Sequence, residues 1–176
     1  MKLRMRDIML LTFIVTTIVS ICGLVHYWNP NSPTLSNVYG NYSHKIYFFF
    51  LVNLIGMISV LIYEYTFKDL ISLIILFTLA MTYLMVLWIS EDVVDSFRFK
   101  SHVTLAFIAF SCVLLYILYH AYKKSDPLLG LLFIISVALF GRIISIALTE
   151  SPNILFEEVS MIILVLISAV RRGGYI

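Results

Sequence analysis

The sequence predicts an all-α polytopic membrane protein: one domain over residues 1–176, with six transmembrane helices, short loops and both termini in the cytoplasm. Of its residues, 61% are hydrophobic and 12% are charged, whereas a soluble domain has about 25% charged residues. A soluble fold of this size could not bury so much apolar surface. Two further observations support the prediction, namely six long apolar runs and an uneven distribution of basic residues between alternate loops.

A helix needs about 20 apolar residues to cross the roughly 30 Å hydrocarbon core of a bilayer. Six runs meet this requirement: 8–27, 46–63, 70–89, 103–122, 128–148 and 154–170. The first follows the basic segment MKLRMR, but no small-residue cleavage site comes after it, so we expect a retained span. Pro127 and Pro152 stand where a first helical turn tolerates proline, and Ser151 is the expected N-cap of the last span.

The distribution of basic residues predicts the orientation of the protein in the membrane. Six spans place both termini on one side, and that side carries eight of the lysines and arginines: Lys2, Arg4, Arg6, Lys68, Lys123, Lys124, Arg171 and Arg172. The opposite segments hold Lys45, Arg98 and Lys100. The positive-inside rule therefore predicts cytoplasmic termini in a cell-membrane protein. Six acidic residues are expected at or near the outer face: Glu91, Asp92, Asp95, Glu150, Glu157 and Glu158.

The last two spans bring opposite charges together. Arg142 lies seven residues before Thr149, or about 10 Å below the expected end of its helix, and Glu157 lies at a similar depth in the next span. An arginine at this depth is costly unless it is paired, hydrated or extended toward the interface. We therefore predict an Arg142–Glu157 ion pair supported by Ser145 or Ser160, and we expect Glu158 to face less inward. The pair either fixes the register of the hairpin or walls an outward-opening polar cavity that holds a head group, ion or substrate.

Histidines and carboxylates complete the predicted outer polar layer. His102 opens the fourth span, and its helical stripe with Ala106 and Ala109 predicts that it faces the bundle interior. His26 and His44 have no metal-ligand spacing and are expected to be interfacial anchors. The candidate binding residues are Arg142, Glu157, His102 and Glu91. The candidate acid–base groups for catalysis are His102, Asp92 and Glu157.

No cofactor, metal or nucleic-acid partner is expected. Cys22 and Cys112 lie in apolar runs and are interpreted as small core residues. His102 and His120 share a helix but are about 27 Å apart by rise, too far for stacked haems, and His120 stands alone on the inner side. No span contains a lysine, which excludes a retinal Schiff base, and no nucleotide-binding or hydrolase motif is present.

Small and polar residues at helical spacing predict close helix packing. The first span has such a face, formed by Thr12, Thr16, Ser20 and Gly23, and the second carries Asn53 and Gly56 on one face. The amide of Asn53 lies within a span and is expected to have a hydrogen-bond partner.

The spacing of several residues resembles the DRAM/Frag/Sfk group of six-span membrane proteins and its prokaryotic relatives of unknown function. The matching residues are Pro33, Ser36 and Gly40 after the first span, His102 with Phe107 and Phe110 in the fourth, and Glu157 or Glu158 in the last. The resemblance implies a protein tied to lipid handling or membrane homeostasis.

Three functions remain open on the sequence. The first is non-catalytic interaction with a lipid or other amphiphile through the outer polar layer. The second is a structural or accessory subunit that contacts other membrane protein subunits. The third is an intramembrane hydrolase or transferase.

Overall fold

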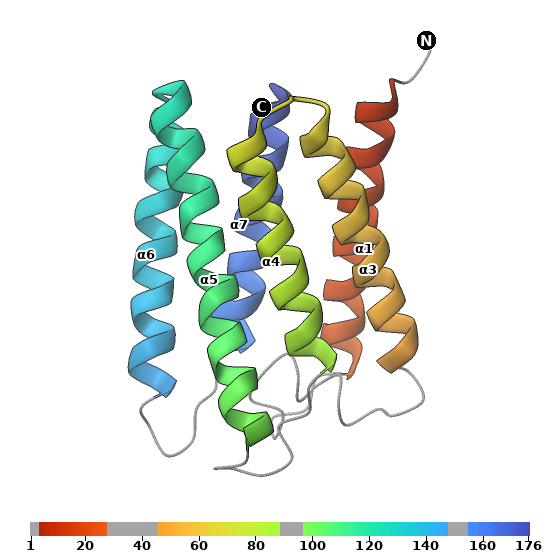
Figure 1. Ribbon diagram of the computed structural model, residues 1–176, viewed down its shortest axis with the longest axis vertical. Coiled ribbons are helices and arrows are strands. Elements are labelled where there is room, and N and C mark those ends of the chain that lie inside the picture. The colour runs from red at the N-terminus through yellow and green to blue at the C-terminus, as the bar shows by residue number, and fades with distance from the viewer. Residues whose placement is uncertain (1–3, 28–45, 89–96, 148–154) are drawn as a thin grey trace.

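The structure, a computed structural model, describes residues 4–27, 46–88, 97–147 and 155–176. Within these ranges it contains six α-helices and no strand, which confirms the all-α prediction (Figure 1). The helices are α1 (Met5–Tyr27), α3 (Ile46–Tyr65), α4 (Leu70–Trp88), α5 (Phe97–Lys124), α6 (Pro127–Ala147) and α7 (Leu155–Gly173). Each of the six apolar runs forms one helix.

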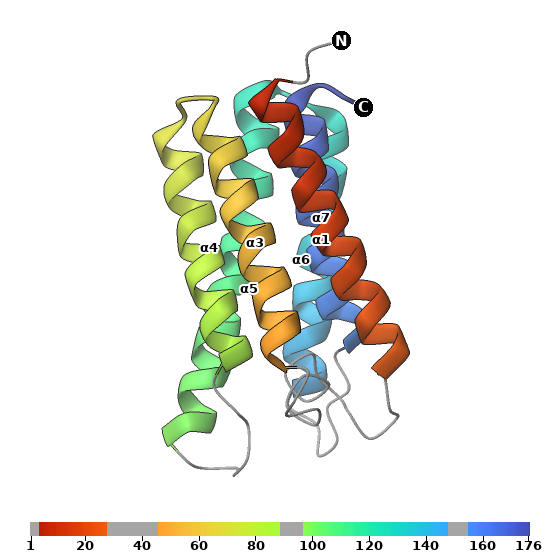
Figure 2. The same cartoon turned by 90° about the vertical axis from the view of Figure 1, so that its right-hand side faces the viewer.

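The helices run alternately up and down and close into a ring. Around the bundle the order is α1, α3, α4, α5, α6 and α7, and α7 completes the ring by packing against α6, α5 and α1. The start of α1 and the end of α7 lie at the same end of the bundle, as Figures 1 and 2 both show. We call this the terminal end, and the other the opposite end. The buried core between the helices includes Val60, Leu76, Ile117, Leu129 and Leu164.

Five of the described helices are long and apolar enough to cross a membrane. The sixth described helix, α7, does not meet this criterion, because its 19 residues include Glu157, Glu158, Arg171 and Arg172. The glutamates and Arg172 are buried against the other helices, so α7 places charge inside the bundle. The other helices expose large apolar side chains, as a surface that faces hydrocarbon requires; examples are Leu11, Ile58, Phe77 and Ile134.

Helix α5 is longer than its apolar run. It has 28 residues and extends about 42 Å. Because it begins at Phe97 rather than at residue 103, His102 lies in its second turn and not at its start. Hydropathy finds the part of a helix within the hydrocarbon core and misses an extension beyond it.

Close packing of α1 on α3 confirms the role predicted for their small residues. A Cβ atom at Gly56 would lie 2.6 Å from Oγ1 of Thr16, and one at Gly23 would clash with the ring of Phe49. A larger side chain at either glycine would therefore force the side chain of Thr16 or of Phe49 to shift. Cys22, in contrast, is exposed, so its interpretation as a core residue is wrong, while Cys112 is buried as expected.

Short turns at the terminal end join α3 to α4 and α5 to α6. Lys68 and Ser125 adopt left-handed backbone angles there, with φ of 54° and 48°. Asp126 then caps α6, because its Oδ1 accepts the backbone N–H of Leu128 at 3.0 Å. Pro127 occupies the first position of α6, as predicted.

Candidate functional site

The predicted ion pair between Arg142 and Glu157 is present. Nε of Arg142 lies 2.5 Å from Oε1 of Glu157, joining α6 to α7. The two side chains differ in environment, since that of Arg142 is 68% exposed and that of Glu157 only 2%. The contact does not have hydrogen-bond geometry at Oε1, so it is mainly electrostatic. Ser160 does not support the pair as predicted, because its hydroxyl donates to the carbonyl of Phe156.

The predicted histidine and acidic residues are only partly described. His102 is buried at 4% exposure, which agrees with the inward orientation predicted for it. His26 is exposed at the end of α1. Glu91, Asp92 and His44 lie outside the described residues, so their roles stay predictions. The described residues hold no group of three or more histidine, cysteine, aspartate or glutamate side chains arranged to bind a metal.

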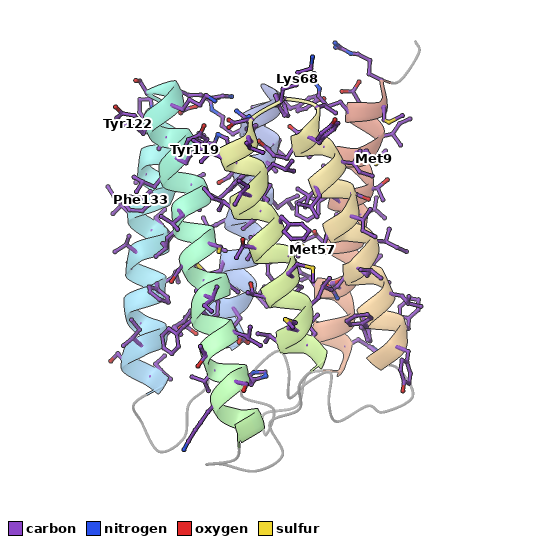
Figure 3. All side chains as sticks on the ribbon, in the orientation of Figure 1. Met9, Met57, Lys68, Tyr119, Tyr122 and Phe133 are labelled. Atoms are coloured by element: carbon purple, nitrogen blue, oxygen red, sulfur yellow. The ribbon has the colours of Figure 1, made fainter. Side chains whose placement is uncertain are left out.

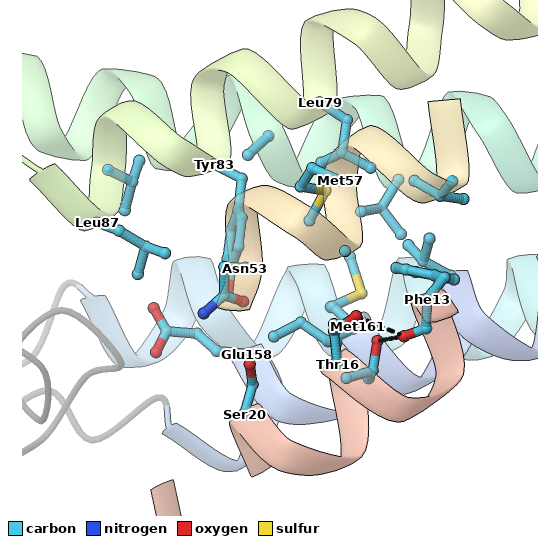
Figure 4. A pocket seen from close by; sticks show the side chains of 18 of the residues that line it. Phe13, Thr16, Ser20, Asn53, Met57, Leu79, Tyr83, Leu87, Glu158 and Met161 are labelled. Atoms are coloured by element: carbon cyan, nitrogen blue, oxygen red, sulfur yellow. Dashed lines mark hydrogen bonds between the residues drawn. The ribbon is translucent and has the colours of Figure 1, made fainter. Parts of the chain in front are cut away.

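A cavity of about 80 Å³ lies inside the bundle, between α1, α3, α4, α5 and α7 (Figure 4). Most of its wall is apolar, with Phe13, Met57, Leu79 and Met161 lying toward one end in Figure 4. Leu76, Ala109 and Val165 complete this apolar part. The cavity therefore occupies the centre of the helix ring rather than the α6–α7 hairpin.

Polar side chains gather toward the other end of the cavity, with Leu87 lying beyond them: Ser20, Asn53, Tyr83 and Glu158 (Figure 4). Asn53 lies seven residues after the start of α3 and Ser20 seven residues before the end of α1. Both are therefore about 10 Å from the opposite end of the bundle. Glu158 lies about 5 Å from the described start of α7. The polar part of the cavity thus faces the opposite end.

Asn53 has the partners that its position requires. Its Nδ2 donates to the carbonyl of Phe49 at 2.8 Å, and its Oδ1 accepts the hydroxyl of Tyr83 at 3.1 Å. These bonds tie α3 to α4 and hold the amide at the cavity wall. Ser20 differs, because its Oγ is buried and has no hydrogen-bond partner.

Among the described residues, the cavity does not use those that the sequence singled out for binding. Arg142, Glu157 and His102 do not line it. The expectation that Glu158 faces less inward is wrong, because Glu158 is buried and lines the cavity together with Met161, Ile162 and Val165. The helical face that carries these apolar residues is the one turned to the centre of the bundle. Glu157, about 100° away around α7, instead faces α6.

A second polar cluster, absent from the sequence predictions, lies at the terminal end. Arg172 of α7 is buried and contacts two buried carboxylates: its Nε donates to Oε1 of Glu64 at 2.8 Å, and its terminal nitrogen donates to Oδ2 of Asp69 at 3.1 Å. Its guanidinium also lies 4.4 Å from the centroid of the Phe67 ring. The other oxygen of Glu64 accepts the Tyr116 hydroxyl at 3.2 Å. This terminal cluster fastens the end of α7 to α3, α4 and α5.

Asp69 is the junction of the terminal cluster and the cap of α4. Its carboxylate accepts from Nζ of Lys123 at 2.7 Å and from the hydroxyl of Tyr119 at 2.8 Å, and it approaches the backbone N–H of Ser72. Figure 3 shows Tyr119 and Lys68 near this end of the bundle. Burial raises the pKa of Asp69, but the hydrogen bonds from Lys123, Tyr119 and Ser72 outweigh it and lower the pKa from 3.8 to about 2. The carboxylate is therefore charged at neutral pH.

His120, the histidine predicted for the side of the termini, belongs to the same cluster. Its Nε2 lies 2.8 Å from Oγ of Ser72 and 3.8 Å from Oε1 of Glu64. The three residue types match those of a serine hydrolase, but the arrangement does not. In a triad the carboxylate contacts Nδ1, whereas here Nδ1 has no partner and both contacts involve Nε2. All three residues are fully buried, so no substrate reaches the serine.

The sequence contained one signal for the terminal cluster. Glu64 and His120 each stand at or within an apolar run, and a charged or polar group in that setting needs a partner. The acidic residues on the side of the termini are Asp7, Glu64, Asp69 and Asp126. Each of them has a basic partner in the structure.

No protein-family model, curated protein or solved structure matches the chain. The resemblance to the DRAM/Frag/Sfk group therefore stays a prediction.

Proposed function

We propose that this protein binds a lipid or other amphiphile inside its helix bundle, without catalysing a reaction. The observation that supports this proposal is the central cavity, which is apolar along most of its wall and polar at the end formed by Ser20, Asn53 and Glu158. An amphiphile has the same division, with an apolar chain and a polar end. Pockets that bind such molecules are mostly apolar, with a few polar groups that fix orientation.

The size and chemistry of the cavity suit a single chain. One water needs about 10–15 Å³, so a cavity of about 80 Å³ has room for roughly five to eight water-sized groups. Apolar cavities stay dry and take up apolar ligands. Each methylene transferred from water into such a site contributes about 0.8 kcal/mol. A short run of methylenes would therefore bind well, with its polar end beside Glu158.

We further propose that the protein lies in the cell membrane with the terminal end in the cytoplasm. Seven basic residues of the described chain support this orientation because they lie at or near the terminal end: Arg4, Arg6, Lys68, Lys123, Lys124, Arg171 and Arg172. In this orientation the polar end of the cavity faces outward. A bound amphiphile would present its head group toward the outer leaflet.

A cavity-filling substitution tests the proposal. Ala109 lines the cavity, so Ala109→Phe should place a ring in the space that the chain of the amphiphile occupies. Ala138→Phe on α6 is the matched control, because Ala138 is exposed on the outer surface of the bundle. Each protein is purified in mild detergent, checked for a monodisperse peak and helical content, and extracted for mass spectrometry.

We expect one amphiphile per chain in the native protein and in Ala138→Phe, and none in folded Ala109→Phe. Equal retention by both variants would contradict the proposal, as would a native protein that carries no amphiphile. The same preparation separates the other two functions left open by the sequence. Stoichiometric partner chains would favour an accessory subunit, and a bound metal would favour the hydrolase or transferase.

A further inference from the structure

An open groove lies on the outer surface of the bundle, between α4 and α5 near the terminal end. It has a volume of about 450 Å³ and is lined by apolar side chains and two tyrosines: Ile71, Ile75, Leu115, Leu118, Tyr119 and Tyr122. None of these residues lines the central cavity, so the two hollows are separate. Between Leu115 and Tyr122 the helix rises about 10 Å. The groove can therefore hold the first part of an acyl chain, while the rest of that chain continues into the bilayer.

Two lysines stand where the groove meets the terminal end. Lys123 lies one helical turn beyond Tyr119 on α5, and Lys68 lies three residues before Ile71 of α4. Figure 3 shows Lys68, Tyr119 and Tyr122 at this end of the bundle. A lipid whose chain occupies the groove would therefore place its head group beside the two lysines.

The charges near this end of the groove are balanced except at Lys68. The carboxylate of Asp69 accepts from Lys123 at 2.7 Å and from Arg172 at 3.1 Å, and Arg172 also neutralises Glu64. Lys68 is exposed, and within the described part of the chain its ammonium group forms no ion pair. The head-group end of the groove therefore carries a surplus of positive charge.

We propose that the groove between α4 and α5 binds one anionic phospholipid, with an acyl chain along the groove and the head group at Lys68 and Lys123. Charge complementarity supports this occupant, because basic residues beside the membrane surface attract anionic lipids. The ammonium group of Lys123 is 48% exposed and has three N–H donors, of which Asp69 and Tyr119 use two. A zwitterionic head group brings its own cation, which Lys68 repels. This site does not depend on amphiphile binding in the central cavity.

A competition between two phospholipids with the same chains tests the proposal. Because the groove is open, we expect its lipid to exchange with detergent during purification, so lipid is added back to the purified protein. Dioleoyl phosphatidylglycerol and dioleoyl phosphatidylcholine are added at equal concentration, and their adducts are counted by native mass spectrometry. We expect one phosphatidylglycerol per chain, at least about fivefold more abundant than the phosphatidylcholine adduct, since one lysine near the surface contributes a factor of about five.

Charge substitutions assign the preference to Lys68. Lys68→Gln should lower the ratio of the two adducts about fivefold, whereas Lys68→Arg should keep it because the charge is retained. Lys124→Gln is the matched control for the loss of one positive charge. Lys124 lies about 100° around α5 from Lys123, and its Nζ donates to the carbonyl of Arg172 on α7, so its loss should leave the ratio unchanged.

A bulky substitution assigns the acyl chain to the groove. Leu118→Trp places an indole ring in the groove and should abolish the phosphatidylglycerol adduct. Leu131→Trp is the matched control, because Leu131 is exposed on α6 at a similar distance from the terminal end and should retain the adduct. Ala109→Phe, which fills the central cavity, should also retain it.

Equal adducts of the two phospholipids in the native protein would overturn the inference, as would an unchanged preference in Lys68→Gln. An adduct that survives Leu118→Trp but is lost in Ala109→Phe would place the phospholipid in the central cavity and would refute the groove as its site. A dimer that Leu118→Trp abolishes, in place of the lipid adduct, would assign the groove to a second copy of the chain.

Discussion

Removing Arg172 should destabilise the protein far more than removing Arg171, the residue beside it. The guanidinium of Arg172 is buried between Glu64 and Asp69. In Arg172→Ala, Glu64 keeps the hydroxyl of Tyr116 but loses its strongest partner, and it has no access to solvent. Arg171 contacts Asp126, and their side chains are 33% and 10% exposed. After the loss of Arg171, Asp126 stays in contact with water and keeps the backbone N–H of Leu128, so less charge is stranded.

The expected loss in the free energy of unfolding depends on how deeply each ion pair is buried. Breaking a buried ion pair typically costs about 3–5 kcal/mol, because the remaining charge stays unpaired in a low dielectric. Loss of the packing on Phe67 adds to this cost. An exposed pair contributes about 0–1 kcal/mol. We therefore expect Arg172→Ala to lower the free energy of unfolding by about 3–5 kcal/mol, and Arg171→Ala by about 1 kcal/mol or less.

Equilibrium unfolding in mixed detergent micelles, followed by circular dichroism, measures both values. The companion variant is Glu64→Gln, which removes the carboxylate that Arg172 neutralises. Residues in direct ionic contact show coupling energies of about 0.5–3 kcal/mol, so Arg172→Ala/Glu64→Gln should cost less than the sum of the single changes. Equal costs for Arg172→Ala and Arg171→Ala, or strict additivity in the cycle, would refute the terminal cluster as a buried charge network.

Three further predictions concern acid stability, the α6–α7 pair and topology. Because the pKa of Asp69 is lowered to about 2, its contribution to the free energy of unfolding is present above about pH 4. That contribution is lost as the pH falls from about 4 toward 2, and acid titration of Asp69→Asn should show a shallower loss over this window than the native protein. Arg142→Gln should cost more stability than Glu157→Gln, since the first leaves a buried carboxylate unpaired and the second leaves an exposed guanidinium free to reach water; the reverse order in a thermal unfolding series would contradict this. Cysteines introduced at Ser36 or Ser96 should react with an impermeant maleimide in intact cells, and reaction only after permeabilisation would reverse the orientation.

The six helices and the Arg142–Glu157 contact could be predicted from the sequence alone. Both depend on features that are local along the chain: an apolar run long enough to cross hydrocarbon, and two charges at similar depth in helices joined by a short connection. The structure extends α5 by six residues at its start, because hydropathy does not detect helical turns outside the hydrocarbon core.

The terminal cluster could not be predicted in the same way. Arg172 and Glu64 are 108 residues apart, and they meet only because α7 closes the ring next to helices that are distant from it in sequence. The inward face of α7 was missed for a related reason. Small and polar residues predict that the face of Glu157 and Ser160 turns inward, whereas the cavity face is apolar apart from Glu158, with Met161 and Val165 beside it. Because the positions that face lipid and those that face the bundle interior can both be apolar, polarity alone does not identify the inward face of a membrane helix.

Photocrosslinking tests amphiphile binding in the cavity most directly. A short-chain alcohol with a diazirine at the end of its chain is incubated with the native protein and irradiated, and the labelled residues are located by peptide mass spectrometry. The end of the chain should react at the apolar end of the cavity, on Met57 of α3 and Met161 of α7, about one helical turn from Asn53 and Glu158, and the same alcohol without the diazirine should compete it away. Reaction confined to outward-facing residues such as Ile58 and Ile163, with no competition, would show that the alcohol contacts only the outer surface and would contradict binding inside the bundle.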